Sequence, residues 1–162
     1  MSRIEIREFA RVVRKMFGLD ESLYFPIVEV LEFVIPQIIE DFSFEIVTHN
    51  ELPNAYAITK PDKKIMKVRQ DVYERAINNS ERDRFTLCHE LGHLLLHDNS
   101  NISFARGDTL PFENPEWQAN TFAAELLAPY HLVKGMNVDE IAEKCVMSRT
   151  AADIQYKKYN NF

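Results

Sequence analysis

The sequence predicts one α+β domain, with helices towards both ends and a small group of strands between them. Residues 4–17 place apolar side chains at helical spacing. The middle of the chain contains three short apolar runs that are typical of strands, at residues 44–47, 55–59 and 65–68. With 162 residues, of which 46% are hydrophobic, the chain is long enough to bury a core of its own.

The first half of the chain predicts three helices around these strands. The helix at residues 4–17 ends at Gly18. A second helical stretch, at residues 25–41, contains Pro36, which must kink or restart it because proline clashes with the preceding turn. Residues 71–78 predict a short helix directly before a longer one.

The longer helix, which we expect to begin near Ser80 or Glu81, contains the motif His89-Glu90-Leu91-Gly92-His93. Residues four apart lie on one face of a helix, so both imidazoles can bind a single metal ion. Glu90 projects beside that ion, where it can act as a general base on a water molecule. Two unrelated histidines on a helix face are the alternative, but this spacing and the glutamate favour a zinc site.

A hydrolytic zinc site takes three protein ligands and leaves the fourth position to water. His97 extends the histidine series by one further turn. At about 1.5 Å rise per residue, His89 and His97 would lie about 12 Å apart on a straight helix, too far for one ion. We therefore expect His97 not to bind the metal, and to be either a residue at the helix end or one that contacts a metal ligand from behind.

A second helix, predicted after the N-cap Asn114, offers the better third ligand in Glu116. Asn120 lies one turn later on the same face, where its amide can orient a histidine ring. The alternative for Glu116 is an acidic residue that favours the helix dipole. Glu125 competes as a ligand, but its position between alanines and leucines favours a solvated edge of this helix.

Residues 84–93 and 116–129 together resemble the ImmA/IrrE family of bacterial zinc metallopeptidases. The resemblance implies a zincin-like (gluzincin-like) fold in which a small sheet packs on the active-site helices. It implies that Zn²⁺ is bound by His89, His93 and Glu116, with Glu90 as catalytic base. It also implies a helix-turn-helix repressor as protein substrate, as for the anti-repressor of mobile genetic elements in that family. Cys88 departs from the alanine that is more usual there, outside the ligand set.

Several other side chains are candidates for contacts with substrate. Tyr130 and His131 are candidates to stabilise the oxyanion, although each is equally explained as a residue at a helix end. The strand at residues 55–59 is a candidate edge for an extended substrate, with a purely structural hairpin as the alternative. In the long segment between the two metal-binding helices, the candidates to line a cleft are Phe104, Arg106 and Phe112, with a polar connector as the equal alternative.

Residues 137–154 resemble a helix-turn-helix, in which Ser148 caps the second helix. A second helix that reads DNA must be basic, yet residues 134–162 contain nearly as many acidic as basic side chains. The net charge of -6 also argues against a nucleic-acid surface. We therefore expect a metallopeptidase domain at residues 1–132 and a small helical unit at residues 133–162 that packs on it or binds a protein partner.

The sequence also predicts the cellular compartment of the protein. No apolar stretch approaches the roughly 20 residues that a membrane span needs, and the charged N-terminus is unlike a signal peptide. We therefore expect a cytoplasmic protein with no membrane association. In that reducing compartment, Cys88 and Cys145 are expected to be buried thiols.

These features predict a zinc metalloendopeptidase, a hydrolase that acts in transcription regulation. One alternative is a metal-stabilised module that binds a transcription regulator without cleaving it. Another is direct DNA binding through residues 137–160. The enzyme is favoured because a structural zinc site needs neither Glu90 nor an open coordination position.

Overall fold

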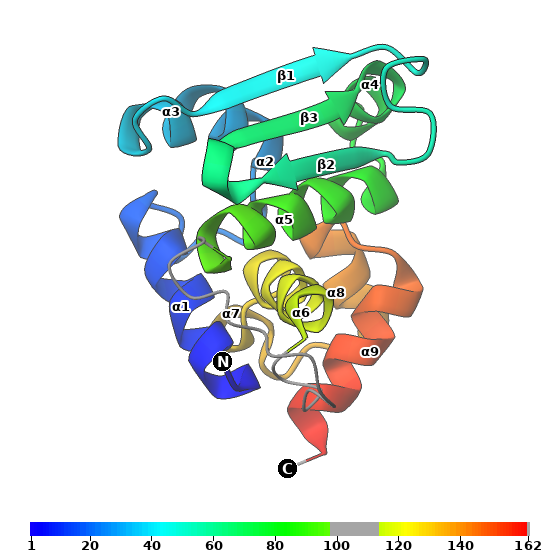
Figure 1. Cartoon of the computed structure of the whole chain (residues 1–162). Coiled ribbons are helices and arrows are strands. Elements are labelled where there is room, and N and C mark those ends of the chain that lie inside the picture. The colour runs from blue at the N-terminus through cyan, green and yellow to red at the C-terminus, as the bar shows by residue number, and fades with distance from the viewer. Residues whose placement is uncertain (98–113, 162) are drawn as a thin grey trace.

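The computed structural model describes residues 1–97 and 114–161. The fold is α+β, as predicted: a three-stranded sheet lies across one side of a group of helices (Figure 1). The strands, in the order they take in the sheet, are β1 (Ser43–Val47), β3 (Ile65–Arg69) and β2 (Ala57–Lys60). β1 runs parallel to β3, and β2 runs antiparallel to it. Figure 1 shows β2 as the strand nearest to α5 (Glu81–Leu96).

The other regular elements of the described chain are helices and short helical turns. Before the sheet come α1 (Arg3–Met16), α2 (Ile27–Glu29), a π-helical turn (Val30–Val34) and α3 (Ile35–Ile38). A 3-10 turn (Pro61–Lys63) connects β2 to β3, and α4 (Gln70–Ile77) precedes α5. The remaining helices are α6 (Pro115–Leu127), α7 (Tyr130–Val133), α8 (Val138–Cys145) and α9 (Arg149–Asn160).

The structure confirms the three helix starts that the sequence predicted from a capping side chain. Ser80 accepts a hydrogen bond from the backbone N–H of Asp83 and begins α5. Asn114 accepts from the backbone N–H groups of Glu116 and Trp117, and Ser148 caps α9 in the same way. These side chains satisfy N–H groups that have no partner within the helix, which fixes where each helix begins.

The predicted interruption at Pro36 is also confirmed. The helical stretch divides into α2, the π-helical turn at Val30–Val34 and α3, with Pro36 in the first turn of α3. Proline fits there because it has no N–H to donate to the preceding turn. The π-helical turn directly precedes the segment that contains Pro36.

The hydrophobic core is continuous from the sheet to the C-terminal helices. α5 lies between β2 and α6, and its Leu87 and Leu91 are fully buried. α8 and α9 contribute buried side chains to the same cluster, among them Ile141 and Ala152. Cys88 and Cys145 are buried free thiols, as predicted. No helix of the described residues is both long and apolar enough to cross a membrane.

The expectation that Glu125 occupies a solvated edge of α6 is wrong. Glu125 is 2% exposed, and its carboxylate forms an ion pair with Arg7 of α1 at 3.2 Å. The hydroxyl of Tyr159 in α9 lies 2.7 Å from the same carboxylate and 2.6 Å from the carbonyl oxygen of Ala128. A carboxylate among apolar neighbours is expected to be exposed, because its burial without a partner costs free energy. Arg7 and Tyr159, which lie 118 and 34 residues away in the chain, supply the partners that allow Glu125 to be buried.

Candidate metal centre

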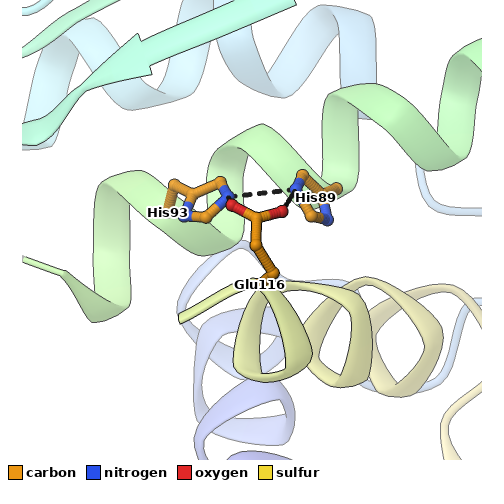
Figure 2. Close-up of side chains that lie close together, drawn as sticks. All are labelled: His89, His93 and Glu116. Atoms are coloured by element: carbon orange, nitrogen blue, oxygen red, sulfur yellow. Dashed lines mark hydrogen bonds and ion pairs between the residues drawn. The ribbon is translucent and has the colours of Figure 1, made fainter. Parts of the chain in front are cut away.

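Two helices bring the predicted ligands together. His89 and His93 lie one turn apart on the face of α5 that is directed at α6, and Glu116 reaches them from the first turn of α6 (Figure 2). The Nε2 atoms of the two histidines are 3.0 Å apart. The carboxylate oxygens of Glu116 lie 3.2 Å from Nε2 of His89 and 3.0 Å from Nε2 of His93.

The close approach of α5 and α6 depends on Gly92. A Cβ atom at this position would lie 3.1 Å from Cα of Ala119 and 3.1 Å from Cδ1 of Phe122. Because glycine has no side chain, the backbone of α6 comes to lie directly against α5. Ala119 is one turn beyond Glu116, so this contact sets how near the Glu116 carboxylate comes to the histidines.

Amide side chains of α6 stand behind the imidazoles. Oδ1 of Asn120 lies 2.8 Å from Nδ1 of His89, which is the orienting contact that the sequence predicted. Behind the other imidazole, Nδ1 of His93 lies 3.2 Å from Nδ1 of His97. Nε2 of His97 in turn lies 3.2 Å from Oε1 of Gln118. His97 therefore ends α5 and contacts a predicted ligand, and it is outside the three-residue donor group.

The donor group fits a divalent metal ion such as zinc. The ligand atoms of His89, His93 and Glu116 all lie within 4.8 Å of one another. Ligands about 2.1 Å from a tetrahedral zinc ion are separated by about 3.4 Å, close to the separations found here. Asn120 can accept the Nδ1–H of His89, which leaves the Nε2 lone pair directed at the other donors. Lone pairs and a carboxylate that converge in this way repel one another unless a proton or a metal cation lies between them.

The surroundings favour the protonation states that such a site needs. Burial, followed by the positive charge that His89 can carry, lowers the pKa of His93 to about 4, although Glu116 opposes the shift. His93 is therefore neutral, and able to bind a metal, at physiological pH. Burial also raises the pKa of Glu90, against the hydrogen bond from Thr59 and the charge of His89. A carboxylate with a raised pKa is the stronger base.

Glu90 is held between α5 and the sheet. It is 8% exposed, and Oγ1 of Thr59 in β2 donates a hydrogen bond to its Oε2 at 2.6 Å. The sequence pointed to the strand as a border of the site, but gave no sign of Thr59. Threonine is frequent in strands, so only the packing of β2 on α5 shows that the Thr59 side chain contacts Glu90. Gln118 was missed for a similar reason, since glutamine is common on helix surfaces.

The structure does not bring Tyr130 and His131 to the histidine pair. The ring of Tyr130 packs on that of Tyr159 at 5.1 Å, and Nε2 of His131 lies 2.8 Å from the carbonyl oxygen of Asp20. Among the described residues, no hydrogen bond, ion pair or ring contact joins either to the donor group. Outside the described residues lie Phe104, Arg106 and Phe112.

Comparison with known proteins agrees with the resemblance found in the sequence. The family model described as Peptidase M78, the IrrE N-terminal-like domain, matches residues 46–152. This range contains β2, α5 and α6, and so every residue of the donor group together with Glu90 and Thr59. A comparison with the curated proteins finds no significant match. The matched range spans more than half of the chain, which therefore belongs to the Peptidase M78 family of metallopeptidases.

Proposed function

We propose that this protein is a zinc-dependent peptidase in which His89, His93 and Glu116 hold the metal. The observation that carries the proposal is the convergence of two imidazole nitrogens and a carboxylate from separate helices, within 4.8 Å of one another. Two histidines and one glutamate form the ligand set of several hydrolytic zinc sites. Glu90, next to His89 in the chain, is not in the donor group and is free for another role.

The other residues supply the acid–base chemistry. Zinc, when bound, acts as a Lewis acid that polarises the scissile carbonyl and lowers the pKa of a water molecule towards neutrality. Glu90 takes the proton from the attacking water and returns it to the leaving amine. Thr59 holds the carboxylate of Glu90 in place by its hydrogen bond to Oε2. Asn120 keeps the ring of His89 directed at the metal.

β2 offers a place for the substrate backbone. Within the described part of the chain it pairs with β3 alone, so its other edge carries unpaired backbone groups. A substrate that adds to this edge in extended form would be held by main-chain hydrogen bonds. Because Thr59 contacts Glu90 from this strand, the bound peptide would lie beside the catalytic base.

The proposed substrate is a helix-turn-helix repressor of a bacterial regulatory or mobile-element system, with cleavage in the cytoplasm. The family resemblance supports this finer proposal. Direct DNA binding by α9 has less support, because two of its three basic side chains form ion pairs with acidic residues. Arg149 is 3.0 Å from Asp139, and Lys157 is 2.6 Å from Asp153.

The test first searches the reading frames beside this gene for a helix-turn-helix protein, which then serves as candidate substrate. We expect the zinc-loaded protein to cleave it and a chelator to stop the cleavage. Glu90→Gln should retain zinc, measured by elemental analysis, and lose cleavage. Glu143→Gln is the matched control, because Glu143 is exposed on α8. Cleavage by Glu90→Gln would refute the role of the base, and zinc-dependent binding of the repressor without cleavage would favour a non-cleaving regulatory module.

A further inference from the structure

We propose that His97 and Gln118 form a hydrogen-bonded relay that fixes the tautomer and the orientation of His93 as a metal ligand. The inference rests on the proposed zinc site and assigns roles to two residues that are neither ligands nor the base. Both are almost fully buried, with His97 8% and Gln118 6% exposed. The relay connects the end of α5 to the first turn of α6.

The relay begins at the proton of His93. Its Nε2 atom is directed at His89 and Glu116, so a ligand role requires the lone pair to be on Nε2 and the proton on Nδ1. This Nδ1–H needs an acceptor because His93 is largely buried. The atom in reach is Nδ1 of His97, at 3.2 Å, and the two rings lie 5.2 Å apart.

The second step fixes His97. To accept from His93, Nδ1 of His97 must carry a lone pair, which puts its own proton on Nε2. Oε1 of Gln118 lies 3.2 Å from that nitrogen and accepts this proton in a hydrogen bond. Each donor in the chain then has one acceptor, and the series ends on an amide oxygen.

With the relay, each of the two ligand imidazoles has an acceptor for its Nδ1–H. Asn120 accepts directly from Nδ1 of His89 at 2.8 Å, whereas Gln118 acts on His93 through His97. One helix, α6, thus supplies the ligand Glu116 and both terminal amides. Partners of this kind orient a ligand imidazole and raise its basicity. His97 is therefore a positioning residue whose loss should weaken zinc binding although it does not touch the metal.

Zinc affinity, measured by competition with a chromophoric chelator, tests the relay without any peptidase substrate. We expect His97→Phe to weaken zinc binding by about 10–100-fold, the usual effect of losing such a partner. His97→Asn should recover much of the affinity, because its amide oxygen can replace Nδ1 as acceptor. His49→Phe is the control for the same change at an exposed histidine. Unchanged affinity in a folded His97→Phe variant would overturn the proposal.

A second measurement keeps the test valid if His97→Phe does not fold. Long-range ¹H–¹⁵N spectra of the zinc-loaded wild-type protein report which nitrogen of each histidine carries the proton. We expect the proton on Nδ1 in His93 and on Nε2 in His97, and the opposite tautomer of either would overturn the relay. A protein that binds no zinc refutes the proposed function instead. In that case the spectrum of the metal-free protein still tests the hydrogen bond between His97 and Gln118. The hydrogen bond requires the proton of His97 to be on Nε2, and a proton on Nδ1 would overturn it.

Discussion

Replacement of Gly92 by alanine tests how α5 and α6 build the metal site. The added Cβ would lie 3.1 Å from Cα of Ala119, 3.1 Å from Cδ1 of Phe122 and 3.3 Å from the carbonyl oxygen of Ala119. Two of these three atoms belong to the backbone of α6, which cannot turn aside as a side chain can. α6 must therefore move away from α5 by a few tenths of an ångström, and Glu116 moves with it.

Two opposing effects set the size of the change in stability. Alanine is better than glycine inside a helix by about 1 kcal/mol, which favours the variant. Overpacking of a tight interior contact costs about 1–3 kcal/mol. The difference predicts a metal-free protein that is about 1 kcal/mol less stable than the wild type. Zinc affinity should fall as well, because the displacement changes the distances between Glu116 and the two histidines.

Urea unfolding of the metal-free variant measures the change in stability, and competition with a chelator measures the change in zinc affinity. Gly135→Ala is a useful comparison: no atom lies within 4 Å of a Cβ there, so any loss of stability comes from its φ of +86° and not from helix contact. Zinc affinity should be unchanged in that variant. If Gly92→Ala is more stable than the wild type and binds zinc equally well, the close contact does not determine the geometry of the site.

Three further predictions concern other parts of the molecule. Thr59→Val should lower peptide turnover without loss of zinc, because the Glu90 carboxylate loses its hydrogen bond, and Thr59→Ser should restore the rate. Burial raises the pKa of Cys88 to about 12 and that of Cys145 to about 11, so both thiols should resist alkylation at pH 8 and react once urea unfolds the chain. Tyr159→Phe should cost about 1–3 kcal/mol in urea unfolding, because a buried carboxylate loses a partner; an unchanged midpoint would contradict that role.

The local part of the site could be predicted from the sequence. The spacing of His89 and His93 fixes their common face, and the caps Ser80 and Asn114 fix where α5 and α6 begin. Glu116 could be proposed because a metal site with two histidines needs a third ligand. The spacing and the caps are local features of the chain, whereas the proposal of Glu116 used the coordination chemistry of the metal.

The remaining features depend on contacts between distant segments. Thr59 meets Glu90 only because β2 packs on α5, and the pattern of its strand is compatible with several registers. Glu125 is buried because Arg7 lies 118 residues away in the chain but adjacent in space. Single-sequence patterns describe the faces of helices and strands, but they do not say which faces meet.

The pairing of Glu125 also bears on how the protein can be shortened. The range that matches the family, residues 46–152, contains Glu125 but neither Arg7 nor Tyr159. A fragment trimmed to that range would keep every metal ligand but lose both partners of Glu125, together with α1, whose Ile6 and Val13 are buried in the common core. Arg7 and Tyr159, near the two ends of the chain, both contact the helix that carries Glu116, so we expect the trimmed fragment to be less stable than the whole chain.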